Sequence, residues 1–408
     1  MTIEIRNAHP EEYPAFVEAL SAAFLERPDV ARVAEAVKPW WEPGRTWAAF
    51  DRGRVCGTFR SWATELTVPG GVRLPASAVA AVTVLPTHRR RGILRGMTAA
   101  EHAAIRARGE AVGLLYASEY GIYGRFGYGP ACRVATWTLD ALATSFHGDP
   151  VSGVELVVPD KAVRDTVEAV FEAWRARQPG EIRRRPLRWD DELGLIESPW
   201  GETWKGLLAL HRDAAGTVDG YARYQPEGKF EQRQPRGRIK LNELHVLTHE
   251  AYHALWRFLA ETDLVSTVIA EGRSPSEGLP WLLTNHRAAM VSEVGEGLWV
   301  RLFDVARALE ARTYEREGGL VLEVVDDELR APLRLALEAS PGGTTCRPTD
   351  RSAELTLPVS ALGAAYLGGT RLRDVVIGMG ADEHRPGAMA TADALFRTAD
   401  EPWCSTFF

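Results

Sequence analysis

A basic loop at residues 86–92 has the residue types and the spacing of a phosphate-binding site. A β-branched run at 81–85 leads into the loop, three arginines occupy 89–91, and Gly92 stands where a helical apolar pattern begins. A helix N-terminus presents unpaired N–H groups and the positive end of the helix dipole, so it attracts anions. Glycine lets an anion approach the backbone, and arginines add positive charge. A solvated basic turn is the simpler alternative, but the order strand, loop, glycine, helix favours the anion site.

Two motifs resemble those of a known enzyme family. The run RRRGIL at 89–94 has the R-x-x-G-x-(G/A) pattern of the GCN5-related N-acetyltransferases (GNAT), with Leu94 in place of the usual small residue. That variant, preceded by PTH at 86–88, resembles the enhanced intracellular survival (Eis) acetyltransferases. The run GIYGRFGYGP at 121–130 contains the Tyr-x-x-x-Gly-aromatic pattern that follows the fifth strand in many GNAT enzymes. The resemblance extends over the whole chain.

The resemblance implies a role for individual residues around the loop. Tyr123 would be the general acid, and the terminal carboxylate of Phe408 would be the general base. Acetyl-coenzyme A (acetyl-CoA) is the implied co-substrate. Its site would consist of strand backbone, a pyrophosphate loop and two residues near the strand splay: Val82, Thr83, Val84, Arg90, Arg91, Gly92, Ile93, Leu94, Arg95, Ser118 and Glu119.

The chemistry of acetyl transfer is consistent with both catalytic roles. An amine attacks a thioester in its neutral form, so a base must remove a proton from the ammonium, and a tyrosine hydroxyl can protonate the departing thiolate. Gly121 and Gly124 indicate that Tyr123 lies in an exposed, constrained loop, whereas the alternative is a packing residue in a turn. An α-carboxyl with a pKa near ~3.5 is a weak base unless burial raises its pKa. The residues alone favour a Phe408 that completes a sheet, and the resemblance reverses that preference.

By resemblance, four further positions belong to the amine side, the part of the site that binds the amine substrate. Glu26 matches an acidic position that helps to bind cationic substrates, although it equally fits a solvated acid at a helix end. Tyr13 replaces another aromatic residue of the family. Ala81 stands where better-known members have a bulky aromatic residue, and Phe407 replaces a penultimate acid. We therefore expect a reshaped, less acidic pocket, and the range of aminoglycosides accepted stays open.

Hydrophobic periodicity predicts the elements that position these residues. In the first part of the chain we expect strands at 2–6, 46–51, 54–65, 73–85, 111–118 and 134–139, and helices at 10–24 and 92–107. The order begins again after the turn-rich segment at 147–150, which indicates a degenerate second copy. The expected fold is α+β. It has tandem GNAT domains at 1–150 and 151–290, followed by a sterol-carrier-protein-like domain at 291–408.

Composition narrows the class of protein. The net charge is −7, with the arginines dispersed among more acids, which argues against nucleic acid and favours cationic partners. Apolar runs are shorter than the ~18 residues of a membrane span, and the N-terminus has no apolar signal core, so we expect a cytoplasmic protein without a membrane partner. Four scattered cysteines indicate reduced, buried thiols. The arginines at 183–185 are expected to form a solvated or interface face.

One metal motif is interpreted as a coincidence. The run HEAYH at 249–253 matches the H-E-x-x-H zinc pattern. Thr248, however, has the features of a helix N-cap, which places His249 and Glu250 in the first turn, and no third ligand follows at the required spacing. We therefore expect no metal.

The sequence thus predicts an N-acetyltransferase that acts on primary amines with acetyl-CoA. Its substrates would be cationic amines: aminoglycosides, lysine side chains or other polyamines. The resemblance also implies a homohexamer built as a trimer of dimers. The alternative is a lipid- or sterol-binding module with an inactive acetyltransferase domain. The intact loop at 89–95, together with Tyr123, favours the enzyme.

Overall fold

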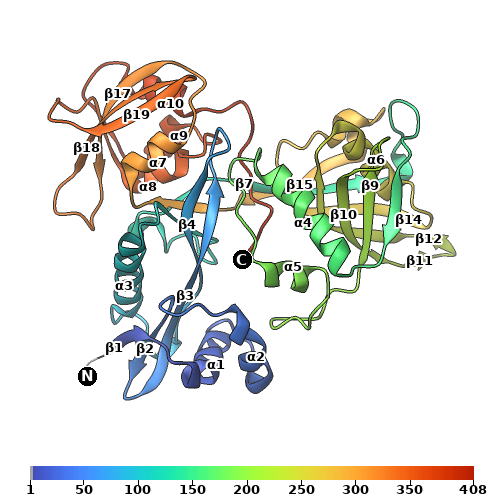
Figure 1. Cartoon of the computed structure of the whole chain (residues 1–408), viewed down its shortest axis with the longest axis horizontal. Coiled ribbons are helices and arrows are strands. Elements are labelled where there is room, and N and C mark those ends of the chain that lie inside the picture. Colours follow the sequence, from blue (N-terminus) through green and yellow to red (C-terminus); the bar gives the residue numbers. More distant parts are fainter. Residues whose placement is uncertain (1–2) are drawn as a thin grey trace.

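The computed structural model describes residues 3–408 and folds them into three lobes, each built around one larger sheet (Figure 1). The first sheet has the order β1-β2-β3-β4-β5-β16-β6. Its elements are β1 (Glu4–Asn7), α1 (Tyr13–Ala23), α2 (Val30–Val37), β2 (Thr46–Asp51), β3 (Arg54–Thr67), β4 (Arg73–Val84), α3 (Ile93–Arg108), β5 (Val112–Leu115), β6 (Gly129–Pro130) and β16 (Trp299–Leu302).

Helices cover both faces of this first sheet. Ala48 and Ala49 are neighbours in β2 and point to opposite faces because side chains alternate along a strand. Ala48 packs with Phe16 of α1, whereas Ala49 packs with Met97 of α3. Because both faces are covered, the central strand β3 is buried along most of its length. The apolar faces of α1 and α3 therefore pack on opposite sides of the same strands.

The second lobe contains another seven-stranded sheet, with the order β15-β7-β14-β13-β10-β9-β8. Its elements are β7 (Arg133–Asp140), β8 (Val154–Val157), α4 (Lys161–Arg175), α5 (Pro186–Glu192), β9 (Leu207–Arg212), β10 (Val218–Glu227), β13 (Gly237–Val246), α6 (His249–Ala260), β14 (Val265–Arg273) and β15 (Ala289–Glu296). A small hairpin, β11 (Phe230–Glu231) and β12 (Gln234–Pro235), projects from it.

The first two sheets exchange strands across the expected domain limits. β7 lies within the range 1–150 but pairs with β14 and β15 in the second sheet. β16 lies within the range 291–408 but pairs with β5 and β6 in the first sheet. The ranges 1–150, 151–290 and 291–408 therefore remain a proposal for the limits of the domains along the chain, with these two strands crossing between the lobes.

The third lobe rests on the first. Its five-stranded sheet has the order β19-β18-β17-β20-β21. Its apolar residues, among them Leu322, Leu337 and Leu362, belong to one core with Val300 and Leu302 of β16. The elements are α7 (Val305–Ala311), β17 (Gly318–Val325), β18 (Leu333–Ser340), β19 (Gly343–Pro348), β20 (Leu355–Pro358), α8 (Val359–Ala365), α9 (Leu372–Met379), β21 (Asp382–Glu383) and α10 (Ala388–Phe396).

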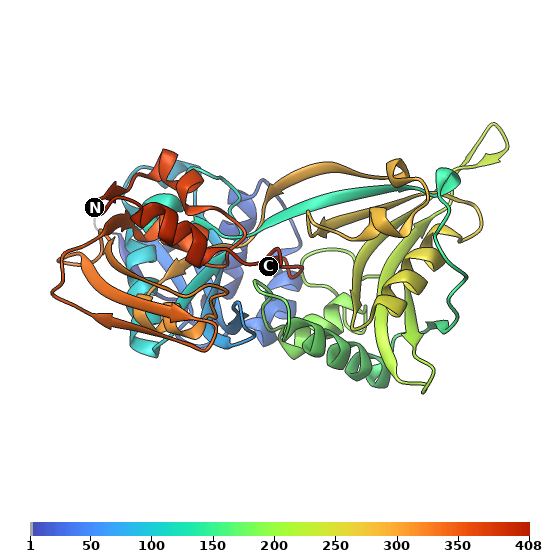
Figure 2. The ribbon, with the colours of Figure 1, turned by 90° about the horizontal axis from the view of Figure 1, so that it is seen from above.

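The last residues leave the third lobe and run back to the junction of the first two lobes. In both views the C-terminus lies near the centre of the molecule, between the first and second lobes (Figure 1, Figure 2). Trp403 fixes this course: its indole N–H donates to the carbonyl of Gly272 at 2.8 Å, and its backbone N–H donates to the carbonyl of Pro179 at 2.9 Å.

Three smaller predictions can be compared with the structure. The Thr248 hydroxyl accepts a hydrogen bond from the Ala251 N–H at 3.1 Å, so the predicted N-cap is confirmed. The four cysteines are all buried and free, as predicted: Cys56, Cys132, Cys346 and Cys404. Among residues 3–408, no helix is both long and apolar enough to span a membrane.

Candidate active site

Strands β4 and β5 diverge and leave part of β4 without a neighbour on one side. They pair in parallel over residues 76–79, whereas β4 continues to Val84 in contact with β3. Between these regions Ala81 has a φ of 53°, and its carbonyl accepts a hydrogen bond from the Thr58 hydroxyl at 2.8 Å. A non-glycine residue with positive φ inside a strand marks a bulge. Beyond it, residues 82–84 present backbone groups towards the gap that β5 has left.

The loop after β4 brings a helix N-terminus to the same gap. Gly92 is the N-cap of α3 and has a φ of 78°, a conformation that glycine adopts without strain. Arg90, two residues earlier, also has a positive φ, of 62°. No side chain among the described residues caps α3, so the N–H groups of its first turn remain available to an anion.

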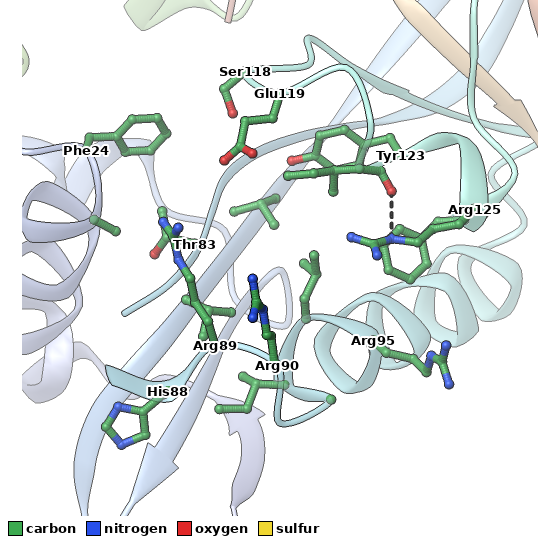
Figure 3. A pocket seen from close by; sticks show the side chains of 18 residues that line it. Phe24, Thr83, His88, Arg89, Arg90, Arg95, Ser118, Glu119, Tyr123 and Arg125 are labelled. Atoms are coloured by element: carbon green, nitrogen blue, oxygen red, sulfur yellow. Dashed lines mark hydrogen bonds between the residues drawn. The ribbon is translucent and has the colours of Figure 1, made fainter. Parts of the chain in front are cut away.

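These elements enclose a cavity of about 670 Å³ (Figure 3). All the predicted acetyl-CoA residues line it except Arg91, whose guanidinium lies 3.5 Å from the Asp51 carboxylate instead. Tyr123 lines it as well. The other residues of the wall were not among those assigned to acetyl-CoA, although His88 and Arg89 belong to the predicted basic loop: Ala23, Phe24, His88, Arg89, Ile122, Arg125 and Phe126.

The charge of the cavity wall is mainly positive. Arg89, Arg90, Arg95 and Arg125 line it, and Glu119 is the acidic side chain on the wall. Arginines bind phosphate oxygens through charge-assisted hydrogen bonds, and the first turn of α3 adds backbone donors. The wall therefore suits a ligand that carries several phosphates at one end. Of the newly found arginines, Arg89 lies within the motif, whereas Arg125 lies in the second run, where its charge alone gave no indication of a role.

Tyr123 lies at the opposite end of the cavity wall from the basic loop. Its side chain is buried, and Figure 3 shows the hydroxyl pointing into the cavity on the side of Glu119. Burial, together with the nearby charge of Glu119, raises the pKa of Tyr123 to about 12. The hydroxyl therefore keeps its proton at neutral pH and can donate it, or a hydrogen bond, to a group in the cavity.

None of the four residues assigned to the amine side lines this cavity. The Tyr13 ring packs against Trp41, with ring centroids 3.4 Å apart. Glu26 is exposed after the end of α1, and Ala81 forms the bulge of β4. At the end of α1 it is Ala23 and Phe24 that reach the cavity wall. Glu26 was assigned because it matches an acidic position of the family, but the chain turns outward there because Leu25 has a positive φ of 65°.

The C-terminal residues line a second, smaller cavity of about 120 Å³. The Phe408 ring packs against Trp62 and Tyr116, with ring centroids 5.0 and 5.1 Å away, respectively. Tyr116 directly follows β5, two residues before Ser118 of the main cavity. Phe407 lines the second cavity too, although its side chain is 67% exposed. The structure thus places the two terminal aromatic rings against Tyr116, two residues from the main cavity wall, and the Phe408 ring also against Trp62 within β3.

The course of the C-terminal tail depends on a buried carboxylate. Glu181 accepts hydrogen bonds from the backbone N–H and the hydroxyl of Ser405, at 2.7 and 2.6 Å. Arg184 donates to the Thr406 hydroxyl at 2.8 Å, and Arg188 donates to the carbonyl of Phe407 at 3.0 Å. All three residues lie in α5 of the second lobe or in the segment between α4 and α5, so the tail is held from that side.

We expect Glu181→Gln to destabilise the protein by about 1.5–3 kcal/mol, the range for hydrogen bonds to a charged group. The glutamine amide nitrogen cannot accept the bonds that one carboxylate oxygen now receives. Denaturant unfolding followed by fluorescence measures the change. The exposed Glu317→Gln is the control and should change the free energy of unfolding by less than about 0.5 kcal/mol. Equal stability of the two variants would contradict an anchoring role for Glu181.

Comparison with protein families agrees with this architecture. Models described as an acetyltransferase (GNAT) domain match residues 4–131 and 180–302, and a sterol carrier protein domain matches residues 305–405. The fold is therefore two GNAT domains followed by a sterol-carrier-like domain. The fold and the cavity define a GNAT acetyltransferase.

Similar proteins narrow this class. The chain is 40% identical over its full length to an uncharacterized N-acetyltransferase of Streptomyces griseus, which it also covers in full. It is 38% identical to the N-acetyltransferase Eis of Mycobacterium tuberculosis over 82% of this chain and 78% of that protein. The crystal structure of Eis1 from Mycobacterium abscessus matches it with a TM-score of 0.85 at 31% identity, over the whole of both chains. The protein belongs to the Eis family of N-acetyltransferases.

Proposed function

We propose that the protein transfers the acetyl group of acetyl-CoA to a primary amine of a small molecule, with acetyl-CoA in the main cavity. One observation carries this proposal: a single cavity joins the α3 N-terminus at Gly92, the unpaired end of β4 and the hydroxyl of Tyr123. The pyrophosphate would lie against the first turn of α3 and Arg90. The pantetheine arm would follow residues 82–84, which brings the thioester towards Tyr123.

The proposed reaction needs two proton transfers. A base takes a proton from the substrate ammonium, and the neutral amine nitrogen then attacks the thioester carbonyl carbon. As the C–N bond forms and the C–S bond breaks, the thiolate takes a proton from Tyr123, and the proton that the nitrogen releases replaces it. We assign that base, on the family resemblance, to a carboxylate at Phe408. Its ring packs against Tyr116, two residues from the cavity wall at Ser118, which supports the assignment.

The substrate class, the cellular location and the oligomeric state are also part of the proposal. The substrate would be a cationic amine, such as an aminoglycoside, a lysine side chain or another polyamine. The protein would be cytoplasmic and would assemble as a homohexamer, a trimer of dimers. An assay of coenzyme A thiol release across a panel of amines tests the main proposal. Turnover no faster with any amine than in buffer would overturn it and would leave the lipid-binding alternative.

We expect acetyl-CoA to raise the melting temperature in a concentration-dependent way, since a ligand at 100 times its Kd stabilises the native state by about 2.7 kcal/mol. Arg90→Gln should weaken binding roughly tenfold because it removes a charge from the cavity wall. Arg91→Gln is the matched control, since Arg91 lies outside the wall beside Asp51. A larger loss of affinity for Arg91→Gln would show that the loop meets the phosphates differently.

A further inference from the structure

Arg60 of β3 is a buried cation whose guanidinium lacks an acidic partner among residues 3–408. Arg60 is only 8% exposed. Its guanidinium makes no ion pair or hydrogen bond with residues 3–408, and its Nε atom is buried without a hydrogen-bond acceptor. Other buried arginines are paired: Arg184 with Glu192, and Arg301 with Asp326. Burial of an unpaired charge is costly, so an arginine left in this state marks a place for an anion from outside the chain.

A cavity is available for that anion. Arg60 lines the second cavity, whose volume of about 120 Å³ equals that of roughly four waters at ~30 Å³ each. This space accommodates a carboxylate or a phosphate group but not a sugar ring system. Indole rings of Trp40, Trp62 and Trp200 complete its walls. The Arg60 guanidinium carbon lies 5.5 Å from the centroid of the Trp62 ring, which helps to hold it in place.

The electrostatics of the cavity favour a negative group. Arginines at 183–185 and 188 share the wall with Arg60, and Asp191 is the acidic side chain on it. Three of these arginines already pair with glutamates, Arg184 and Arg188 with Glu192 and Arg185 with Glu42, so Arg60 is the cation that an incoming anion would pair with. Burial and the charge of Arg185 lower the pKa of Arg60 to about 10, against the opposing effect of Glu42. Arg60 therefore remains charged at neutral pH, and an incoming anion gains a charge-assisted hydrogen bond.

The cavity lies on the amine side of the site. The Ser61 hydroxyl donates to Glu101 of α3, so its neighbours Arg60 and Trp62 point to the opposite face of the sheet, the face that carries α1 and α2. Along β3, Arg60 lies two residues from Thr58, which is hydrogen-bonded to Thr83 of the main cavity wall. Two residues of a strand span roughly 7 Å, so this separation along β3 is within the length of one small molecule.

We propose that the second cavity binds an anionic group of the acceptor, so that the amine that is acetylated also carries a carboxylate or a phosphate. This inference rests on the proposed acetyltransferase function. It predicts a substrate such as an amino acid or an aminoalkyl phosphate, with its ammonium directed to the main cavity. Among the cationic amines proposed above, the inference thus favours those that also carry an anionic group over aminoglycosides and polyamines, which have no group that pairs with Arg60.

Matched amines of opposite terminal charge test the inference. The wild-type enzyme should have a higher kcat/KM for 6-aminohexanoate than for 1,6-diaminohexane, and for O-phosphoethanolamine than for ethanolamine if the anion is a phosphate. Arg60→Met should reduce the preference for the anionic member of the pair by about tenfold to a hundredfold, the equivalent of one charged hydrogen bond. Arg60→Lys should keep part of it. Arg330→Met, which removes an exposed arginine of the third lobe, is the control and should leave the preference intact.

A binding measurement keeps the inference separate from turnover. Acetate and inorganic phosphate should raise the melting temperature of the wild type more than that of Arg60→Met, even if no amine in the panel is acetylated. Arg60→Met should itself fold and keep its melting temperature, because it removes an unpaired buried charge. Equal anion stabilisation of both proteins, or an Arg60→Met variant that is destabilised and slow with all amines alike, would overturn the inference. The second result would identify the carboxylate of Phe408 as the counter-ion of Arg60.

Discussion

Tyr123→Phe is expected to lower kcat by about 100-fold while the affinity for acetyl-CoA stays the same. The substitution removes one hydroxyl from a buried ring and leaves the ring contacts of the cavity wall in place. Loss of a general acid typically costs 10²- to 10⁴-fold in rate, and the thiolate would leave without a donor. Because the pKa of Tyr123 is raised to about 12, the wild type should show no alkaline loss of kcat from this group below about pH 11.

Steady-state kinetics and a direct binding measurement check this prediction together. Tyr120→Phe is the matched control, since Tyr120 lies in the same loop but is 59% exposed and does not line the cavity. Its kcat should remain within about twofold of the wild type. An unchanged kcat for Tyr123→Phe would assign Tyr123 to packing. A fall in acetyl-CoA affinity of the same size would assign it to binding rather than to proton transfer.

Extension of the chain beyond Phe408 is expected to remove turnover. An added residue converts the carboxylate at this position into a neutral amide, and loss of the general base proposed there would lower kcat by 10²- to 10⁴-fold. Deletion of Phe408 should have the same effect, because the new terminus moves back by up to ~3.5 Å. Phe408→Leu keeps both the carboxylate and most of the apolar contact with Trp62, so we expect a mild loss.

Acetyl-CoA should bind all three terminal variants, because the basic loop at Gly92 lies apart from the tail. A thermal shift with acetyl-CoA checks that each protein is folded. Full activity of the extended chain would show that the terminus only anchors the lobes. Glu119, which lines the main cavity, would then be the first alternative base, and Glu26 the second.

The basic loop could be predicted because its information is local. Residues 86–94 are contiguous, and strand, glycine and helix follow one another in the order in which they fold. β2 was expected at 46–51 and is found at Thr46–Asp51 for the same reason, since glycines at 44 and 53 bound the apolar run. α8 was missed because all seven of its residues are buried, which leaves no polar face to reveal a helical period.

The second cavity could not be predicted because its wall is assembled from distant segments. Trp40, Arg60, the arginine run at 183–185 and Phe408 have no shared local pattern. The run was expected to be solvated or to form an interface, and it lies at the junction of the first two lobes, where Arg184 is buried. The exchange of β7 and β16 escaped prediction for a related reason, because a strand pattern shows that a strand forms but not which sheet it joins.

The position of β16 has a consequence for synthesis of the protein on the ribosome. The first sheet places Trp299–Leu302 between β5, which ends at Leu115, and β6. At about 5–20 residues per second, the ribosome needs roughly 10 to 40 seconds to make the intervening segment. During that time the β5 edge is an open strand of apolar residues, which is prone to pair with other chains. We therefore expect the nascent first lobe to need protection by a chaperone, and a fragment that stops at residue 131 to aggregate even though it contains every residue of the main cavity.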